Sequence, residues 1–223
     1  TRAGAEIYDA QNRRANRAET RIHLDATRIE KAGYKHFMAK EIAEQPVVIA
    51  DALKHYCTAE GTLQLPKGVD FKGIARVTLV ACGTASYACH VAKYWFEQIA
   101  GLPADIDIAS EFRYRDPVLS PASMAIFVSQ SGETADTLAA LRHATGKVAR
   151  VVSVVNVPTS SIARESDLAL PILAGVEVGV ASTKAFTCQL TVLALMALKA
   201  AQDRGRIDAA TLAKRLDSLR AVP

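Results

Sequence analysis

The stretch MAIFVSQSGET, residues 124–134, decides how this chain folds. Its first five residues are apolar, and such a run predicts a strand that is buried on both faces of a sheet. Hydroxyl, amide and glycine residues follow, and a helix is expected to begin near Glu133. A strand, a turn of small residues and a helix together form the repeating unit of a parallel α/β sheet.

The same unit recurs on both sides of this stretch. Further strands are predicted over residues 77–82, 104–108, 151–155 and 168–173, the last at an edge or strand end because it contains Pro171. Helices are predicted over residues 87–99, after the strand at 124–128, over 183–202 and over 209–219, the last with Asp208 as a possible N-cap. This alternation predicts a three-layer α/β/α sandwich with a five-stranded parallel sheet.

A short helical segment is predicted before the sheet. Apolar residues recur at helical spacing between Phe37 and Leu53, and Pro46 is expected to divide the segment into two helices. The chain is therefore divided into a polar lead at 1–32, a helical segment at 33–73, the sheet domain at 74–205 and a final helix at 206–223.

The turn at residues 129–134 has the composition of an anion site. The hydroxyls of Ser129, Ser131 and Thr134 can donate hydrogen bonds, and the N-terminus of the following helix adds free N–H groups. Gly132 lets the backbone approach an anion closely. Plain helix capping by Ser131 is the alternative interpretation. Glu133 would repel a phosphate, so its side chain is expected to point away from the turn.

A second turn, at residues 82–86, also ends a strand with a glycine and hydroxyl residues, here Thr84 and Ser86. Alone it indicates no more than capping, but parallel neighbouring strands place both turns at one edge of the sheet. A third candidate lies at residues 178–186, where Ser182 or Thr183 can cap the long helix. Lys184 is interpreted as a surface or structural residue rather than a Schiff-base lysine, because no activating base is evident.

Composition excludes several other classes of protein. The formal net charge is +4, and the local basic cluster at residues 13–21 is interpreted as a solvated segment rather than a nucleic-acid arm. The four cysteines form no CxxC pair, so no metal site, disulfide framework or cofactor is expected. The apolar run at 180–201 contains polar residues, which favours a buried helix over a membrane span. A cytoplasmic protein is expected.

The motifs resemble the sugar isomerase (SIS) family, whose pattern is a Cys-Gly-Thr-Ser-like turn and a Ser-Gln-Ser-Gly-Glu-Thr turn. Four further segments are similar to the isomerase part of the glutamine–fructose-6-phosphate aminotransferases. These are GYKHFMAKEIAEQP (33–46), ASEFRYR (109–115), ESDLAL (165–170) and GVASTKAFT (179–187). This second resemblance covers the chain from Gly33 onward.

The resemblance implies the first of two SIS domains in an enzyme that makes glucosamine 6-phosphate from fructose 6-phosphate and glutamine. It implies sugar-phosphate contacts by Thr84, Ser129, Gln130, Ser131 and Thr134, and sugar contacts by Val180 and Ser182. Ser86 is a further candidate from the first turn, although its hydroxyl would point elsewhere if the helix has already begun. Residues 1–32 would then link to a glutaminase domain, and 206–223 would lead to the second SIS domain. A homodimer is also implied, with no membrane or nucleic-acid partner.

Two features qualify the resemblance. The family often has Ser where this chain has Ala85, so one phosphate-facing hydroxyl is missing. The family's catalytic residues lie outside this chain, so no catalytic residue is assigned and the isolated chain is expected to bind weakly without catalysing. The alternatives left open are a sugar-phosphate-sensing SIS domain of a transcription regulator and a stand-alone phosphosugar isomerase.

Overall fold

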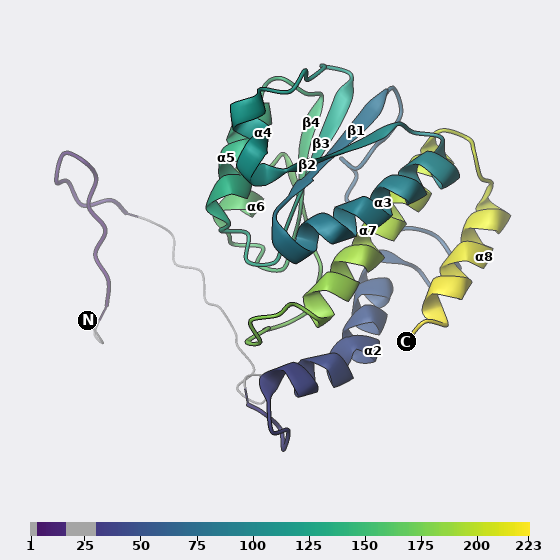
Figure 1. Ribbon diagram of the computed structural model, residues 1–223, viewed down its shortest axis with the longest axis horizontal. Coiled ribbons are helices and arrows are strands. Elements are labelled where there is room, and N and C mark those ends of the chain that lie inside the picture. The colour runs from purple at the N-terminus through teal and green to yellow at the C-terminus, as the bar shows by residue number, and fades with distance from the viewer. Residues whose placement is uncertain (1–3, 17–29) are drawn as a thin grey trace.

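The computed structural model describes residues 4–16 and 30–223, and within them one parallel sheet forms the centre of the fold (Figure 1). Its strands lie in the order β2-β1-β3-β4-β5, and every neighbouring pair is parallel. The strands are β1 (Arg76–Ala81), β2 (Ala104–Ile108), β3 (Ser123–Ser129), β4 (Arg150–Val155) and β5 (Leu168–Pro171).

Helices cover both faces of the sheet, which confirms the predicted three-layer sandwich (Figure 1). One layer holds α3 and α7, with α2 and α8 packed outside them, and the other holds α4, α5 and α6. The bounds are α2 (Phe37–Tyr56), α3 (Gly83–Ala100), α4 (Ala109–Arg115), α5 (Ala135–Ala144), α6 (Ser161–Glu165), α7 (Lys184–Asp203) and α8 (Ala209–Arg220).

Strand β3 shows why the sheet must be covered on both faces. All seven of its residues are buried. Met124, Ile126 and Val128 belong to the core beneath α3 and α7, whereas Ala125 and Phe127 belong to the core beneath α4 and α5. Successive side chains of a strand point to opposite faces, so a continuous apolar run requires an apolar layer on each side.

The strand order reverses between β1 and β3. From β1 the chain passes outward to β2, then returns across β1 to β3 and continues to β5. Such a reversal separates the loops that follow the two central strands and leaves a crevice at their carboxyl ends. Those loops are the two turns that begin at Cys82 and Ser129, so the topology directs both to the same crevice.

The helical segment before the sheet differs from the prediction. Residues Phe37–Tyr56 form one helix with Pro46 inside it, so the expected division into two helices is wrong. Proline lacks the N–H that would bond to the carbonyl of Ile42. That carbonyl instead accepts a hydrogen bond from Nε2 of Gln45 at 3.2 Å. The side chain before the proline therefore satisfies the group that the proline leaves unpaired.

Helix α7 is long and apolar enough to cross a membrane by length and composition alone. Fourteen of its residues are buried, among them Leu193, Leu195 and Met196, and it packs between α2, α3 and the sheet. Packing within the protein therefore accounts for its apolar composition, in agreement with the interpretation as a buried helix.

Candidate functional site

The loop after β3 is held in one shape by its own hydroxyl groups. Oγ of Ser129 accepts a hydrogen bond from the N–H of Gly132 at 3.1 Å and lies 3.1 Å from Oγ1 of Thr134. Oγ of Ser131 accepts from the N–H of Glu133 at 3.1 Å. Helix α5 begins only at Ala135, two residues later than expected, and its N-cap residue Thr134 makes no side-chain capping bond. Capping of α5 therefore does not explain these hydroxyls.

Gly132 is required by both conformation and space. Its φ of +66° lies in the left-handed region, which disfavours residues with a Cβ. A Cβ built there would lie 2.0 Å from Oγ of Ser160, at the start of α6. The carbonyl of Gly132 also accepts from the N–H of Ile162 at 3.0 Å. The loop is thus packed tightly against the β4–α6 connection.

Glu133 points away from the loop, as the sequence predicted. Its Oε1 accepts a hydrogen bond from the backbone N–H of Ser161 at 2.6 Å. This hydrogen bond lowers the pKa of the Glu133 carboxyl below its ordinary value, so the side chain stays ionised. The negative charge is directed to the start of α6, and repulsion of an anion beside Ser131 is reduced.

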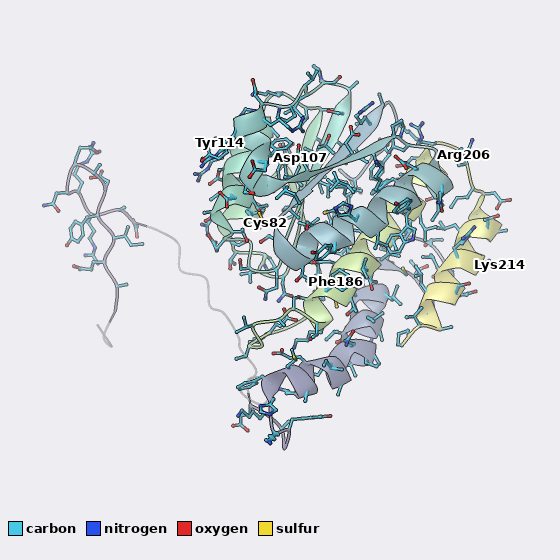
Figure 2. The ribbon with its side chains drawn as sticks, in the orientation of Figure 1. Cys82, Asp107, Tyr114, Phe186, Arg206 and Lys214 are labelled. Atoms are coloured by element: carbon cyan, nitrogen blue, oxygen red, sulfur yellow. The ribbon has the colours of Figure 1, made fainter. Side chains whose placement is uncertain are left out.

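A cavity of about 240 Å³ lies at the carboxyl ends of β1 and β3. This is slightly below the 300–1,000 Å³ that drug-sized ligands fill, so it suits a ligand of monosaccharide size. Figure 2 labels Cys82 and Phe186, which mark the N-terminal ends of α3 and α7. The lining residues are Cys82, Thr84, Ala85, Val128, Ser129, Gln130, Ser131, Thr134, Thr137, Glu177, Gly179, Val180, Ser182 and Gln189.

The groups in this cavity that could attract an anion are backbone N–H and hydroxyl groups. Its lining includes no lysine or arginine. The N-cap residues of α3 and α5, Cys82 and Thr134, both line the cavity, and neither makes a side-chain capping bond. Uncapped helix N-termini present free N–H groups and the positive end of the helix dipole. The arrangement can bind an anion by neutral donors alone.

The N-terminus of α7 is occupied by a side chain that the sequence analysis did not identify. Oε1 of Glu177 accepts from the N–H groups of Thr183 at 3.0 Å and Ala185 at 3.2 Å. Its Oε2 accepts from the hydroxyl of Ser182 at 3.2 Å. Thr183 is the N-cap residue, as predicted, but the side chains of Ser182 and Thr183 make no capping bond. A carboxylate from the preceding loop performs that function instead. No local motif marks a capping side chain that lies seven residues before the first residue of the helix.

Helix α2 also holds the loop that precedes α7. The buried carboxylate of Glu41 accepts from the N–H groups of Val178 at 2.6 Å and Gly179 at 3.1 Å. Lys184 is also buried and its Nζ lies 2.7 Å from Oε2 of Glu44. Lys184 is thus a structural lysine, in agreement with the sequence interpretation, and it is buried rather than on the surface.

The structure brings most of the expected site residues together. Thr84, Ser129, Gln130, Ser131, Thr134, Val180 and Ser182 all line the cavity. Ser86 does not line it, because this residue is buried and its hydroxyl donates to the carbonyl of Gly83 at 2.6 Å. The lining adds Thr137 and Gln189, which the motifs did not include. In the part of the chain that the structure describes, no group of His, Cys, Asp and Glu could hold a metal ion.

A family model described as the SIS domain matches residues 71–199. The chain belongs to the SIS domain family. This confirms the resemblance that the two turns indicated. The cavity lies within the matched range, at the loops that follow β1 and β3 and before α7.

Among curated proteins, the chain is similar to aminotransferases. It is 55% identical over 210 residues to a glutamine–fructose-6-phosphate aminotransferase of Bradyrhizobium diazoefficiens. The aligned residues make up 93% of this chain and 34% of the relative. The enzyme of the same name from Zymomonas mobilis is 52% identical over 209 residues, with the same coverage. The chain therefore spans about a third of the length of these relatives.

Among solved structures, the C-terminal domain of glucosamine-fructose-6-phosphate aminotransferase from Francisella tularensis is similar, with a TM-score of 0.82 and 43% identity. That similarity covers 86% of this chain and 55% of the other. Tagatose-6-phosphate ketose/aldose isomerase from Escherichia coli matches with a TM-score of 0.61 at 19% identity, which shows the shared fold alone.

Proposed function

We propose that this SIS domain binds the phosphate and sugar of fructose 6-phosphate and glucosamine 6-phosphate within a glutamine–fructose-6-phosphate aminotransferase. One observation carries the proposal. Two uncapped helix N-termini and the hydroxyls of Ser129, Ser131 and Thr134 surround one small cavity at the strand-order reversal. The relatives that are half identical to this chain bear the name of that enzyme.

The proposed orientation places the phosphate at the loop after β3. Ser129, Gln130, Ser131 and Thr134 would hold it there, with Thr84 at the start of α3. The sugar would extend toward Val180 and Ser182, in the loop before α7. Ser86 is left out because its hydroxyl is engaged within the first turn of α3. Catalysis would depend on residues beyond this chain, so the isolated domain should bind without isomerising.

Titration of the chain with glucosamine 6-phosphate, followed by amide chemical shifts, tests this proposal. The amide signals of Ser131 and Thr134 should show the largest shifts and should saturate together. Shifts confined to residues far from the cavity would contradict the assignment. Isomerisation of fructose 6-phosphate by the chain alone would contradict the division of binding and chemistry between domains.

The substitution Ala85→Ser offers a gain-of-function test. Ala85 lines the cavity in the first turn of α3, and the family often has a serine here. An added hydroxyl should strengthen phosphate binding by about 0.5–1.5 kcal/mol, the net value of one hydrogen bond. Gln98→Ser is the matched control, because Gln98 lies on the same helix but is exposed and does not line the cavity.

The proposed parent enzyme would place a glutaminase domain before residues 1–32 and a second SIS domain after residues 206–223, in the cytoplasm. Of residues 1–32, 1–3 and 17–29 lie outside the described residues.

Association with another SIS domain would use an exposed stripe on α3. Tyr87, Val91 and Tyr94 lie three to four residues apart there and are 65%, 37% and 59% exposed. Sedimentation of the chain and of a Tyr94→Lys variant tests this, because the substitution should weaken self-association.

A stand-alone phosphosugar isomerase would need an acid or base inside this cavity. Glu177 is the one carboxylate in the lining, and its oxygens are engaged by the N-terminus of α7 and by Ser182. A transcription regulator would need a DNA-binding unit. No observation on the described residues favours either alternative over the aminotransferase domain.

A further inference from the structure

Two polar side chains in the cavity wall each carry a buried oxygen with no hydrogen-bond partner among the described residues. They are Gln189 of α7, which is 1% exposed and whose Oε1 is unpaired, and Thr137 of α5, which is fully buried and whose Oγ1 is unpaired. Both line the cavity described above. Buried polar groups are nearly always paired in folded proteins, so each unpaired group here requires an explanation.

The two side chains reach the cavity from opposite layers of the fold. Thr137 lies one helical turn after Thr134, on the same side of α5 as the phosphate-binding loop. Gln189 lies one turn after Ala185, whose N–H is bound by Glu177. Thr137 and Gln189 are both more deeply buried than the hydroxyls of the loop, so together they form the polar floor of the cavity.

Five other polar residues of the lining differ in having partners. Ser129, Ser131 and Thr134 are hydrogen-bonded within their loop, and Glu177 and Ser182 are bonded to each other. The floor thus holds hydrogen-bonding capacity that the protein does not use. A carbonyl oxygen such as Oε1 needs a donor, which a sugar hydroxyl supplies and a fully ionised phosphate does not. The unpaired carbonyl therefore favours the polyol part of a ligand over its phosphate.

We propose that Gln189 and Thr137 are specificity residues that bind a hydroxyl group of the sugar. This inference rests on the proposed function and adds a role to it. The loop after β3 holds the phosphate, and the polar floor distinguishes a sugar phosphate from phosphate alone. Sites built to hydrogen-bond a hydroxyl bind analogues without that hydroxyl more weakly, because their buried polar groups are then left unpaired.

The experiment compares two ligands and three variants by amide-shift titration of the whole chain. The ligands are glucosamine 6-phosphate and inorganic phosphate. Gln189→Met and Thr137→Val remove the floor's polar atoms at nearly constant size. Ser153→Ala is the matched control, because Oγ of Ser153 is also buried and unpaired but does not line the cavity. Gln189→Met and Thr137→Val should each weaken glucosamine 6-phosphate binding about three- to tenfold and change phosphate binding less than about twofold.

Three results would overturn the inference. Unchanged glucosamine 6-phosphate binding by both floor variants would show that the floor does not contact the sugar. Equal weakening of both ligands would indicate a structural effect. Because each substitution removes an unpaired atom, a variant that unfolds at a lower urea concentration than Ser153→Ala would show that the atom has a structural role. If the unaltered chain binds neither ligand, the proposed function itself fails, which is distinguishable from failure of the floor alone.

Discussion

Removal of the Glu177 carboxylate should destabilise the N-terminus of α7. This side chain accepts two backbone N–H groups and the hydroxyl of Ser182. Loss of an N-cap acceptor costs about 1 kcal/mol, and loss of a negative charge at a helix N-terminus costs about 0.3–1 kcal/mol. Glu177→Ala should therefore lower the free energy of unfolding by about 1–2 kcal/mol.

Glu177→Gln separates the two contributions. Glutamine retains one acceptor oxygen but carries no charge, so about 0.3–1 kcal/mol should be lost. Glu97→Ala is the control, because Glu97 makes an exposed 3.8 Å ion pair with Lys93 within α3. Such surface pairs contribute about 0.5 kcal/mol or less. The expected order of stability is therefore Glu97→Ala, then Glu177→Gln, then Glu177→Ala.

Urea unfolding followed by far-UV circular dichroism measures these differences. With a denaturant dependence of about 2–3 kcal/mol/M for a domain of this size, a loss of 1.5 kcal/mol shifts the midpoint by about 0.5–0.8 M. If Glu177→Ala unfolds at the same midpoint as Glu97→Ala, the carboxylate is not the cap of α7. If Glu177→Gln is as damaging as Glu177→Ala, charge rather than hydrogen bonding dominates.

Three further predictions concern Gly132, Glu41 and Cys82. Gly132→Ala should lower the free energy of unfolding by about 2 kcal/mol or more, whereas Gly146→Ala, at φ +77° with open space around it, should lose only about 1 kcal/mol; urea midpoints compare them. Glu41→Ala should cost about 2–3 kcal/mol by thermal unfolding, because it leaves two backbone N–H groups of the cavity loop unpaired, and an unchanged melting temperature would contradict this support. Cys82 should react with a thiol reagent before the other three cysteines, because those three are buried and burial raises the pKa of the Cys188 thiol to about 12. Because Cys82 lines the cavity, glucosamine 6-phosphate should slow its reaction. Equal reaction rates for all four thiols would contradict this prediction.

The sheet could be predicted from the sequence because its strands are marked locally. Residues 104–108 were predicted as a strand and form β2 with the same bounds, and the other four strands differ at their ends by no more than two residues. Strand β2 is marked by the alternation of its sequence ADIDI, whereas β1, β3 and β4 are buried on both faces and read as nearly continuous apolar runs. Both patterns are recognisable without knowing the neighbouring strands. The single helix α2 was missed because Pro46 is accommodated inside it, where the side chain of Gln45 pairs the carbonyl of Ile42, a contact that helical periodicity does not reveal.

The candidate site was predictable only where its residues follow a strand directly. The hydroxyls of the loop after β3 belong to one short segment, so their proximity follows from chain connectivity. Glu41 binds Val178 across 137 positions of the sequence, and nothing local marks that contact. Ser86 shows that membership of a site turn does not place a side chain in the cavity. It lies in the turn after β1, but α3 begins at Gly83 and the hydroxyl of Ser86 donates to the carbonyl of Gly83.

The distribution of charge in the cavity constrains how a ligand could lie in it. The N-termini of α3 and α5 are uncapped, whereas the N-terminus of α7 is occupied by the carboxylate of Glu177. An anion is therefore stabilised at the α3 and α5 side and repelled at the α7 side. A ligand with one anionic end and one neutral or cationic end satisfies both sides at once. A phosphorylated sugar, and more so a phosphorylated amino sugar, has this polarity, so the cap that orders α7 would also fix the direction in which the proposed ligand binds.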